Sequence, residues 1–302
     1  MKVVNLTTRQ LKKIPTLNLS SNIVNTEANL YIYTSKTKYN YVTELLKLYY
    51  NQEIDHIADK IAIISKLIAT FESLDMEELV TPSALVCLDG EISGFTMPFI
   101  EDNVNLTLLL NNPKVKLSFK LQFLKKILAI LIKINNSHEL AGTFYLGDIH
   151  EANFIWDIMA QTVRAVDLDS AYFAGGPISV SKVLTYNHLL ENLPNKYPID
   201  EKSGQFIPNQ ETTSASFLYM LLNVLSGCSN SYRWSYSEFY QYLSYLNKKG
   251  LSKELLDLIS KLYTSGEMDI YHPDLLDCID TSTEYTLQKA KIPSRNGGYY
   301  SR

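Results

Sequence analysis

A polar loop between apolar, strand-forming segments constrains this chain more than any other feature. Its two parts run from Tyr145 to Trp156 and from Val163 to Ser170. Within about twenty residues they contain three groups suited to handling a metal-bound phosphate, which are Asp148, Asn153 and Asp167. The apolar runs beside these groups predict a short hairpin that holds them in place. The pattern indicates a catalytic loop followed by a metal-binding loop.

The bulk properties exclude several classes of protein. With 302 residues the chain can bury a sizeable core in one large domain or two lobes. A formal charge of -4 gives no reason to expect a nucleic acid or a membrane as partner, and no apolar run approaches the roughly 18 residues of a spanning helix. The three cysteines are widely spaced, so neither a disulfide framework nor a zinc site is indicated. The first residues lack the apolar segment of a signal peptide, and we expect a cytoplasmic protein of undetermined oligomeric state.

The first hundred residues predict strands and one helix. Residues 1–28 have no clear period and indicate an irregular arm or an edge strand. Aromatic and aliphatic residues at 29–33 and 41–50 predict two antiparallel strands, and the spacing of apolar residues in 55–71 predicts an amphipathic helix. The dipeptide Asp89-Gly90 between two further apolar runs predicts a hairpin.

After Glu101 the pattern changes to helices. A wide apolar stripe predicts a buried helix at 117–137, and the apolar run at 214–225 predicts a central helix. Two amphipathic helices are expected near 237–248 and 252–263. The long segment Tyr172 to Gln210 precedes the helix at 214–225, and loops of that length are usually functional or mobile.

This order of elements, together with Gly147-Asp-Ile-His150 and Asn153, resembles the protein-kinase-like superfamily from about Asn29 to Ile279. The resemblance implies an α+β, two-lobed protein-kinase-like fold with a small β-rich N-lobe carrying one helix and a larger, mainly helical C-lobe. The expected divisions are an arm at 1–28, the N-lobe at 29–101, the C-lobe at 102–288 and a tail at 289–302. The residue two positions after the loop aspartate is His150, where protein kinases proper carry lysine. A histidine at this position resembles the phosphotransferase and atypical bacterial kinase branches of the superfamily.

The resemblance implies Mg-ATP as the bound cofactor and assigns roles to the polar loop. Phosphoryl transfer depends on positioning and charge neutralisation, so a site needs a carboxylate for the nucleophile and oxygen ligands for Mg²⁺. Asp148 matches the residue that accepts or orients the acceptor hydroxyl proton. Asn153 and Asp167 match the metal ligands, with Asp169 as an alternative to Asp167. His150 contacts phosphate or acceptor, or is a hydrogen-bonded structural histidine; the sequence leaves both open.

Lys47 lies in an apolar strand and resembles the lysine that holds the α- and β-phosphates, although alternation also allows a solvent-facing position. Its partner on the following helix should be a carboxylate, for which we favour Asp59 over Glu53 even though the family has Glu there.

The connector that ends at Glu101 resembles the hinge that reads adenine through backbone groups. The Pro98 carbonyl and the Ile100 amide are the expected contacts, since proline loses nothing when only its carbonyl is used. Met97 is expected at the back of the nucleotide pocket, or in ordinary core packing.

Three departures from the family pattern are visible. The segment Ser20 to Asn29, in the place of the phosphate loop, has no glycine; Gly147 replaces an arginine, and Thr213 an aspartate. The first expectation is a protein Ser/Thr kinase with Tyr172 to Gln210 as peptide platform. The alternatives are a small-molecule phosphotransferase and a pseudokinase that acts as a binding module.

Overall fold

The computed structural model describes residues 2–17, 27–36, 40–50, 57–179, 199–201, 206–227, 234–248, 251–264, 270 and 279. The protein is α+β, as predicted. It divides into two compact units, the first of residues 1–103 with 155–179 and the second of residues 104–154 with 180–302. The sequence had placed 155–179 in the C-lobe. Most of the glycine-free segment, Glu53, much of the expected peptide platform and the tail lie outside the described residues.

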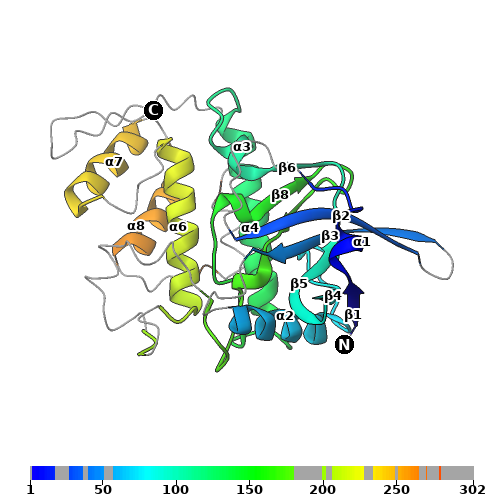
Figure 1. Cartoon of the computed structure of the whole chain (residues 1–302). Helices are drawn as coiled ribbons and strands as arrows, with labels where there is room; N and C mark the ends of the chain where they lie inside the picture. The colour runs from blue at the N-terminus through cyan, green and yellow to red at the C-terminus, as the bar shows by residue number, and fades with distance from the viewer. Residues whose placement is uncertain are drawn as a thin grey trace. The chain divides into compact units, whose positions relative to one another are not determined.

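The first unit contains a five-stranded sheet with the order β1-β4-β5-β3-β2 (Figure 1). The strands are β1 (Val3–Leu6), β2 (Ala28–Lys36), β3 (Tyr41–Tyr49), β4 (Ala84–Leu88) and β5 (Glu91–Pro98). All neighbours are antiparallel except β1 and β4, which are parallel. The predicted hairpin turns at Asp89 and Gly90, which both have positive φ, as a tight turn between twisted strands requires.

The arm expected at 1–28 is partly ordered. It contributes β1 at the edge of the sheet and the short helix α1 (Thr8–Leu11). A capping box between Thr7 and Gln10 begins this helix. The backbone N–H of Thr8 donates to Asp89 at 3.1 Å, which joins the arm to the hairpin turn.

Helix α2 (Ile57–Phe71) packs on one face of the sheet, and its apolar stripe meets buried side chains of β3, β4 and β5. The opposite face carries a second apolar cluster that includes Leu46 and Leu48. Because successive residues of a strand face opposite sides, Lys47 and Tyr49 lie on the α2 side. Strand alternation therefore directs Lys47 into the interior of the first unit, not toward solvent.

Residues 155–179 complete the first unit. Strands β8 (Phe154–Asp157) and β9 (Thr162–Ala165) form the predicted hairpin, and a short 3₁₀ turn, η2 (Leu168–Ser170), and strand β10 (Tyr172–Phe173) follow. The backbone of Ala165 exchanges hydrogen bonds with the segment before β4, accepting from Val80 at 2.9 Å and donating to Glu78 at 2.8 Å. This anchor fixes the point at which the loop that carries Asp167 and Asp169 leaves β9.

The described part of the second unit is mainly helical. Its described elements are β6 (Asn103–Asn105, which begins in the first unit), α3 (Leu106–Leu110), α4 (Leu117–Asn136), β7 (Phe144–Tyr145), η1 (Glu151–Asn153), α6 (Gln210–Ser226), α7 (Tyr236–Lys248) and α8 (Lys253–Thr264). Helix α6 is buried on nearly all sides, as expected of a central helix. Several of its Ser and Thr hydroxyls donate to the carbonyl four residues earlier, for example Ser216 to Thr212 at 2.9 Å, which satisfies these buried polar groups. The short helix α3 was not predicted.

Candidate functional site

The first half of the candidate site lies within the first unit and centres on Lys47. The side chain of Lys47 is 3% exposed, so its ammonium group requires counter-ions. Both counter-ions come from the loop after β9. The Nζ atom forms an ion pair with Asp167 and a second ion pair of 2.9 Å with Oδ2 of Asp169. Residues about 120 positions apart in the sequence thus meet in one buried cluster.

The backbone of Asp167 has a left-handed conformation, which is uncommon for residues other than glycine. Its φ of 61° and ψ of 46° lie in the left-handed region, which aspartate tolerates better than most residues. Its side chain is 45% exposed although it contacts Lys47. The carboxylate therefore has room for a further ligand on its open side.

Asp169 is the buried counterpart, with a side chain that is only 1% exposed. Its Oδ2 atom accepts a hydrogen bond of 2.6 Å from the Tyr49 hydroxyl and lies 3.5 Å from the ammonium group of Lys60 on α2. Lys60 also pairs with Glu27 and lies 5.6 Å from the centre of the Tyr49 ring. Asp169 is therefore the common acceptor of the cluster.

Burial and charge act in opposite directions on this cluster. Burial alone would lower the pKa of Lys47, but the charges of Asp167 and Asp169 outweigh it and raise that pKa. Burial alone would raise the pKa of Asp169, but Lys47 and Lys60 hold it well below its usual range. Desolvation raises the pKa of Asp167, and the charge of Asp169 adds to the rise against the pull of Lys47. Burial and then the charge of Asp169 raise the pKa of Tyr49. The pKa values of the two aspartates are thus shifted in opposite directions.

The second half of the candidate site is the loop after β7, within the second unit. The imidazole Nε2 of His150 lies 3.3 Å from Oδ2 of Asp148, and its Nδ1 accepts from the backbone N–H of Ala152 at 3.2 Å. A neutral imidazole in this arrangement carries its proton on Nε2, facing Asp148. The other carboxylate oxygen of Asp148, Oδ1, is buried and has no hydrogen-bond partner within the described part of the chain. His150 therefore orients Asp148 and leaves one of its oxygens for another donor.

Asn153 stabilises the same loop, because its side-chain amide donates to the carbonyl of Asp148 at 2.9 Å. Asn105, which caps helix α3, supports the loop from the other side by donating to the carbonyl of Ala152 at 2.8 Å. The short helix α3 therefore serves as a support for this loop.

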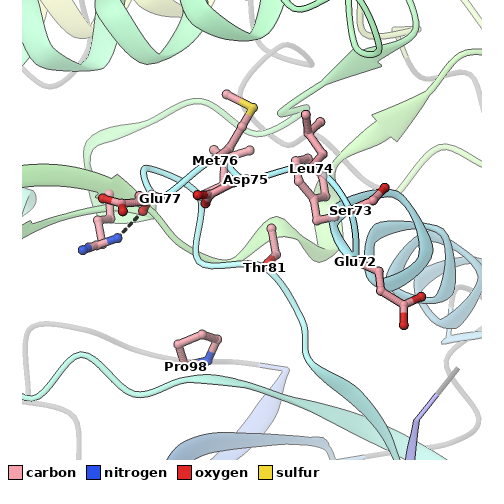
Figure 2. Close-up of a pocket in the computed structure, with 11 residues that line it drawn as sticks. Glu72, Ser73, Leu74, Asp75, Met76, Glu77, Thr81 and Pro98 are labelled. Carbon is pink, nitrogen blue, oxygen red and sulfur yellow. Dashed lines mark hydrogen bonds between the residues drawn. The ribbon is translucent and has the colours of Figure 1, made fainter.

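The residues expected to read adenine lie at the end of β5. Met97 is 6% exposed and belongs to the core cluster under α2, against which Ile100 also packs. Pro98 is the last residue of β5 and lines a hollow of about 410 Å³ within the first unit (Figure 2). The side chain of Met97 is therefore packed in the core, which was the second of the two expectations for this residue.

The hollow in Figure 2 differs in character from the Lys47 cluster. Three exposed carboxylates, those of Glu72, Asp75 and Glu77, lie on it, with Arg164 as the one basic side chain in its lining. Arg164 is already engaged, because it donates to Asp157 at 2.7 Å and to the carbonyl of Glu77. An acidic wall of this kind repels phosphate groups. We therefore place no phosphate in this hollow.

The structure brings the predicted residues together in two sets, Lys47 with Asp167 in the first unit and Asp148 with Asn153 in the second. The expected pair of Lys47 with Asp59 is absent, because the ion pairs of Lys47 go to Asp167 and Asp169. The residue of α2 that reaches this cluster is the next one, Lys60, whose ammonium group lies 3.5 Å from Asp169.

Sequence reasoning missed Lys60 and Tyr49 as members of the cluster, although both left a signal. Lys60 stands three residues after Ile57 and four before Ile64, so it lies on the apolar stripe of α2. Tyr49 stands two residues after Lys47 and shares its face of β3. A lysine inside a buried stripe requires an anion nearby.

No known protein family model matches this chain, and no curated protein is significantly similar to it in sequence. In the part of the chain that the structure describes, no helix is both long and apolar enough to cross a membrane. Over the same residues, no group of three or more His, Cys, Asp or Glu side chains forms a metal centre. Such a group is not required for Mg²⁺, which is commonly held by one or two carboxylates, waters and substrate phosphates.

Proposed function

We propose that the protein is an ATP- and Mg²⁺-dependent phosphotransferase with a protein-kinase-like fold, which transfers the γ-phosphate to a hydroxyl group. The observation that carries the proposal is the contact of the buried Lys47 on β3 with Asp167 after β9. A strand lysine beside a metal-loop aspartate is what phosphoryl transfer needs to hold the phosphates and their metal ion. The order of elements in the chain and the polar loop at Asp148 support the same function.

The donor atoms fit a magnesium ion. Asp167 offers a carboxylate with an open side, and Asn153 retains its side-chain oxygen because its nitrogen is the atom that bonds to Asp148. Oxygen ligands of this kind suit Mg²⁺, which supplies charge neutralisation on the phosphates when bound. In this proposal Asp167 and Asn153 each keep the role of metal ligand that the resemblance implies for them.

Asp148 receives the proton of the acceptor. Its Oδ1 atom has no partner among the described residues, whereas Oδ2 faces the Nε2–H group of His150. The acceptor oxygen forms a bond to the γ-phosphorus, the bond from that phosphorus to the β-phosphate oxygen breaks, and ADP leaves. The hydroxyl proton passes to Asp148, while His150 keeps the carboxylate oriented.

Protein serine or threonine is our first choice of acceptor. A small-molecule acceptor is the second, favoured by His150 in the place where protein kinases proper carry lysine. The third possibility, a pseudokinase that binds nucleotide without turnover, is favoured by the absence of glycine from Ser20 to Asn29. Retention of Lys47, Asp148, Asn153 and Asp167 together argues against it, because a binding module has no need of all four.

The test is incubation of purified protein with Mg²⁺ and γ-labelled ATP, alone, with a generic protein substrate and with a panel of hydroxylated metabolites. Label on protein supports the first acceptor class, label on a metabolite the second, and binding without turnover the pseudokinase. Asp148→Ala should lower turnover by about 10²–10⁴-fold and keep nucleotide binding, as loss of a general base does. Asp167→Ala should weaken Mg-ATP binding, and Asp75→Ala, at an exposed position, is the matched control. Full turnover by Asp148→Ala would refute the assigned role of the loop.

A further inference from the structure

In the described part of the first unit, helix α2 supplies no carboxylate to Lys47; instead it supplies Lys60. We propose that Asp169 orients Lys47 for phosphate binding in the place of a helix carboxylate, and that Lys60 and Tyr49 are the positioning residues that hold Asp169. The inference rests on the proposed function, because it assigns roles within the same nucleotide site.

The geometry separates the two aspartates. Oδ2 of Asp169 receives Lys47 at 2.9 Å and Tyr49 at 2.6 Å, with Lys60 at 3.5 Å. Two hydrogen-bond donors and a second ammonium group converge on one oxygen of a side chain that is 1% exposed, whereas Asp167 is 45% exposed and has Lys47 as its ion-pair partner. A metal ion that keeps several waters needs an accessible carboxylate. Asp167 is therefore the metal ligand, and Asp169 serves the lysine.

Lys60 reaches the cluster from the helix side. Its side chain is 10% exposed, pairs with Glu27 immediately before β2 and lies against the Tyr49 ring. It therefore connects three segments, α2, the start of β2 and the loop after β9. Helix α2 therefore influences Lys47 indirectly, because its residue Lys60 contacts Asp169 and Asp169 contacts Lys47. The sequence had led us to expect a carboxylate on this helix that contacts Lys47 directly.

The two roles predict different responses to Mg²⁺. We would measure ATP affinity by calorimetry in excess EDTA and in excess Mg²⁺, and take the ratio of the two Kd values as the gain from the metal. Asp169→Asn should weaken binding about tenfold in both conditions, the scale of one charge-assisted contact, and so preserve the ratio. Asp167→Asn should reduce the ratio toward one while affinity in EDTA changes little.

Lys60 supplies a second test that does not alter either aspartate. Lys60→Met should weaken binding about as much as Asp169→Asn with the same unchanged ratio. Lys60→Arg should restore affinity, because a guanidinium group can donate to both Asp169 and Glu27. Tyr49→Phe keeps the ring and removes only the hydroxyl, so it should show a smaller loss in the same direction. Urea unfolding of each variant checks the fold, and if Asp169→Asn does not fold, the Lys60 and Tyr49 variants provide the comparison.

The outcomes separate this inference from the proposed function. If Asp169→Asn reduces the Mg²⁺ ratio as Asp167→Asn does, Asp169 is a metal ligand and the inference is overturned while the phosphotransferase proposal stands. If Asp169→Asn and Lys60→Met both bind ATP with wild-type affinity, the inference is also overturned. If the wild-type protein binds no nucleotide in either condition, the proposed function and the inference fail together.

Discussion

Replacement of Gly94 by alanine should damage the sheet next to Lys47. Gly94 lies on β5 opposite Leu48 of β3, one position from the pair of Phe95 with Lys47. An added Cβ atom would overlap the carbonyl oxygen of Lys47 and lie 3.0 Å from the Cα atom of Leu48. Both obstacles are backbone atoms of β3, which pairs with a strand on each side, so no flexible side chain can move away to make room.

The loss of stability follows from the displacement of β3 from β5 that the added Cβ atom requires. Overpacking of a tight interior costs about 1–3 kcal/mol, and each ladder hydrogen bond lost as β3 and β5 separate adds about 1 kcal/mol. We expect Gly94→Ala to lower the free energy of unfolding by about 3 kcal/mol, or the melting temperature by roughly 6–10 °C. Because the displaced segment contains Lys47, ATP affinity should fall as well.

Urea unfolding followed by circular dichroism, with calorimetric titration of ATP, measures both effects. Gly90→Ala is the matched control in the same hairpin, since its φ is 97° and nothing lies within 4 Å of the added Cβ atom. It should cost about 1 kcal/mol through backbone strain alone and leave ATP affinity unchanged. If Gly94→Ala has the stability and the ATP affinity of the wild type, the register of β3 against β5 is wrong.

Three further predictions concern stability. Arg164→Ala should lower the urea midpoint by an amount equivalent to about 2–3 kcal/mol, because it leaves the buried carboxylate of Asp157 without its cation. Burial alone would raise the pKa of Asp157, but its hydrogen bonds lower that pKa. The ionised Asp157 therefore stabilises the fold fully above its unfolded-state pKa, and this stabilisation is lost as pH falls through its folded-state pKa. An Arg164→Ala protein with the acid sensitivity of the wild type would contradict this. Asn209→Ala removes the capping box of α6 and should cost about 1 kcal/mol in thermal unfolding, whereas Asn209→Ser should recover most of it. Tyr49→Phe should destabilise by about 1–2 kcal/mol near neutral pH, and because the folded pKa of Tyr49 is raised, the difference from wild type should shrink above roughly pH 10; a constant difference would show that Tyr49 does not donate to Asp169.

The loop at Asp148 shows what a local motif can and cannot predict. Its spacing suggested a carboxylate for the acceptor and left the role of His150 open. In the structure, Nδ1 of His150 accepts a hydrogen bond from the backbone N–H of Ala152, and Nε2 lies 3.3 Å from Oδ2 of Asp148. The 3₁₀ turn η1 and the hydrogen bond from Asn105 hold this loop, and sequence patterns reveal neither of them.

The sequence by itself determined the elements that depend on short-range periodicity. The apolar stripe of α2, the alternation through Leu46 and Leu48 and the Asp89-Gly90 turn are local patterns that any packing of this chain must satisfy. Helix α3 escaped prediction because five residues are too few to show a helical period.

Only the tertiary structure decided which charge meets which. Lys47 lies on the face of β3 opposite to Leu46 and Leu48, and it is buried there because α2 covers that face. Its partners Asp167 and Asp169 lie about 120 residues later. Lys60, not Asp59, faces the cluster because the rotation of α2 on the sheet sets which neighbouring side chain points inward. Long-range ion pairs depend on how separate segments pack, and local propensity contains no information about that packing. The pairing of two lysines with one buried aspartate is therefore a property of the fold.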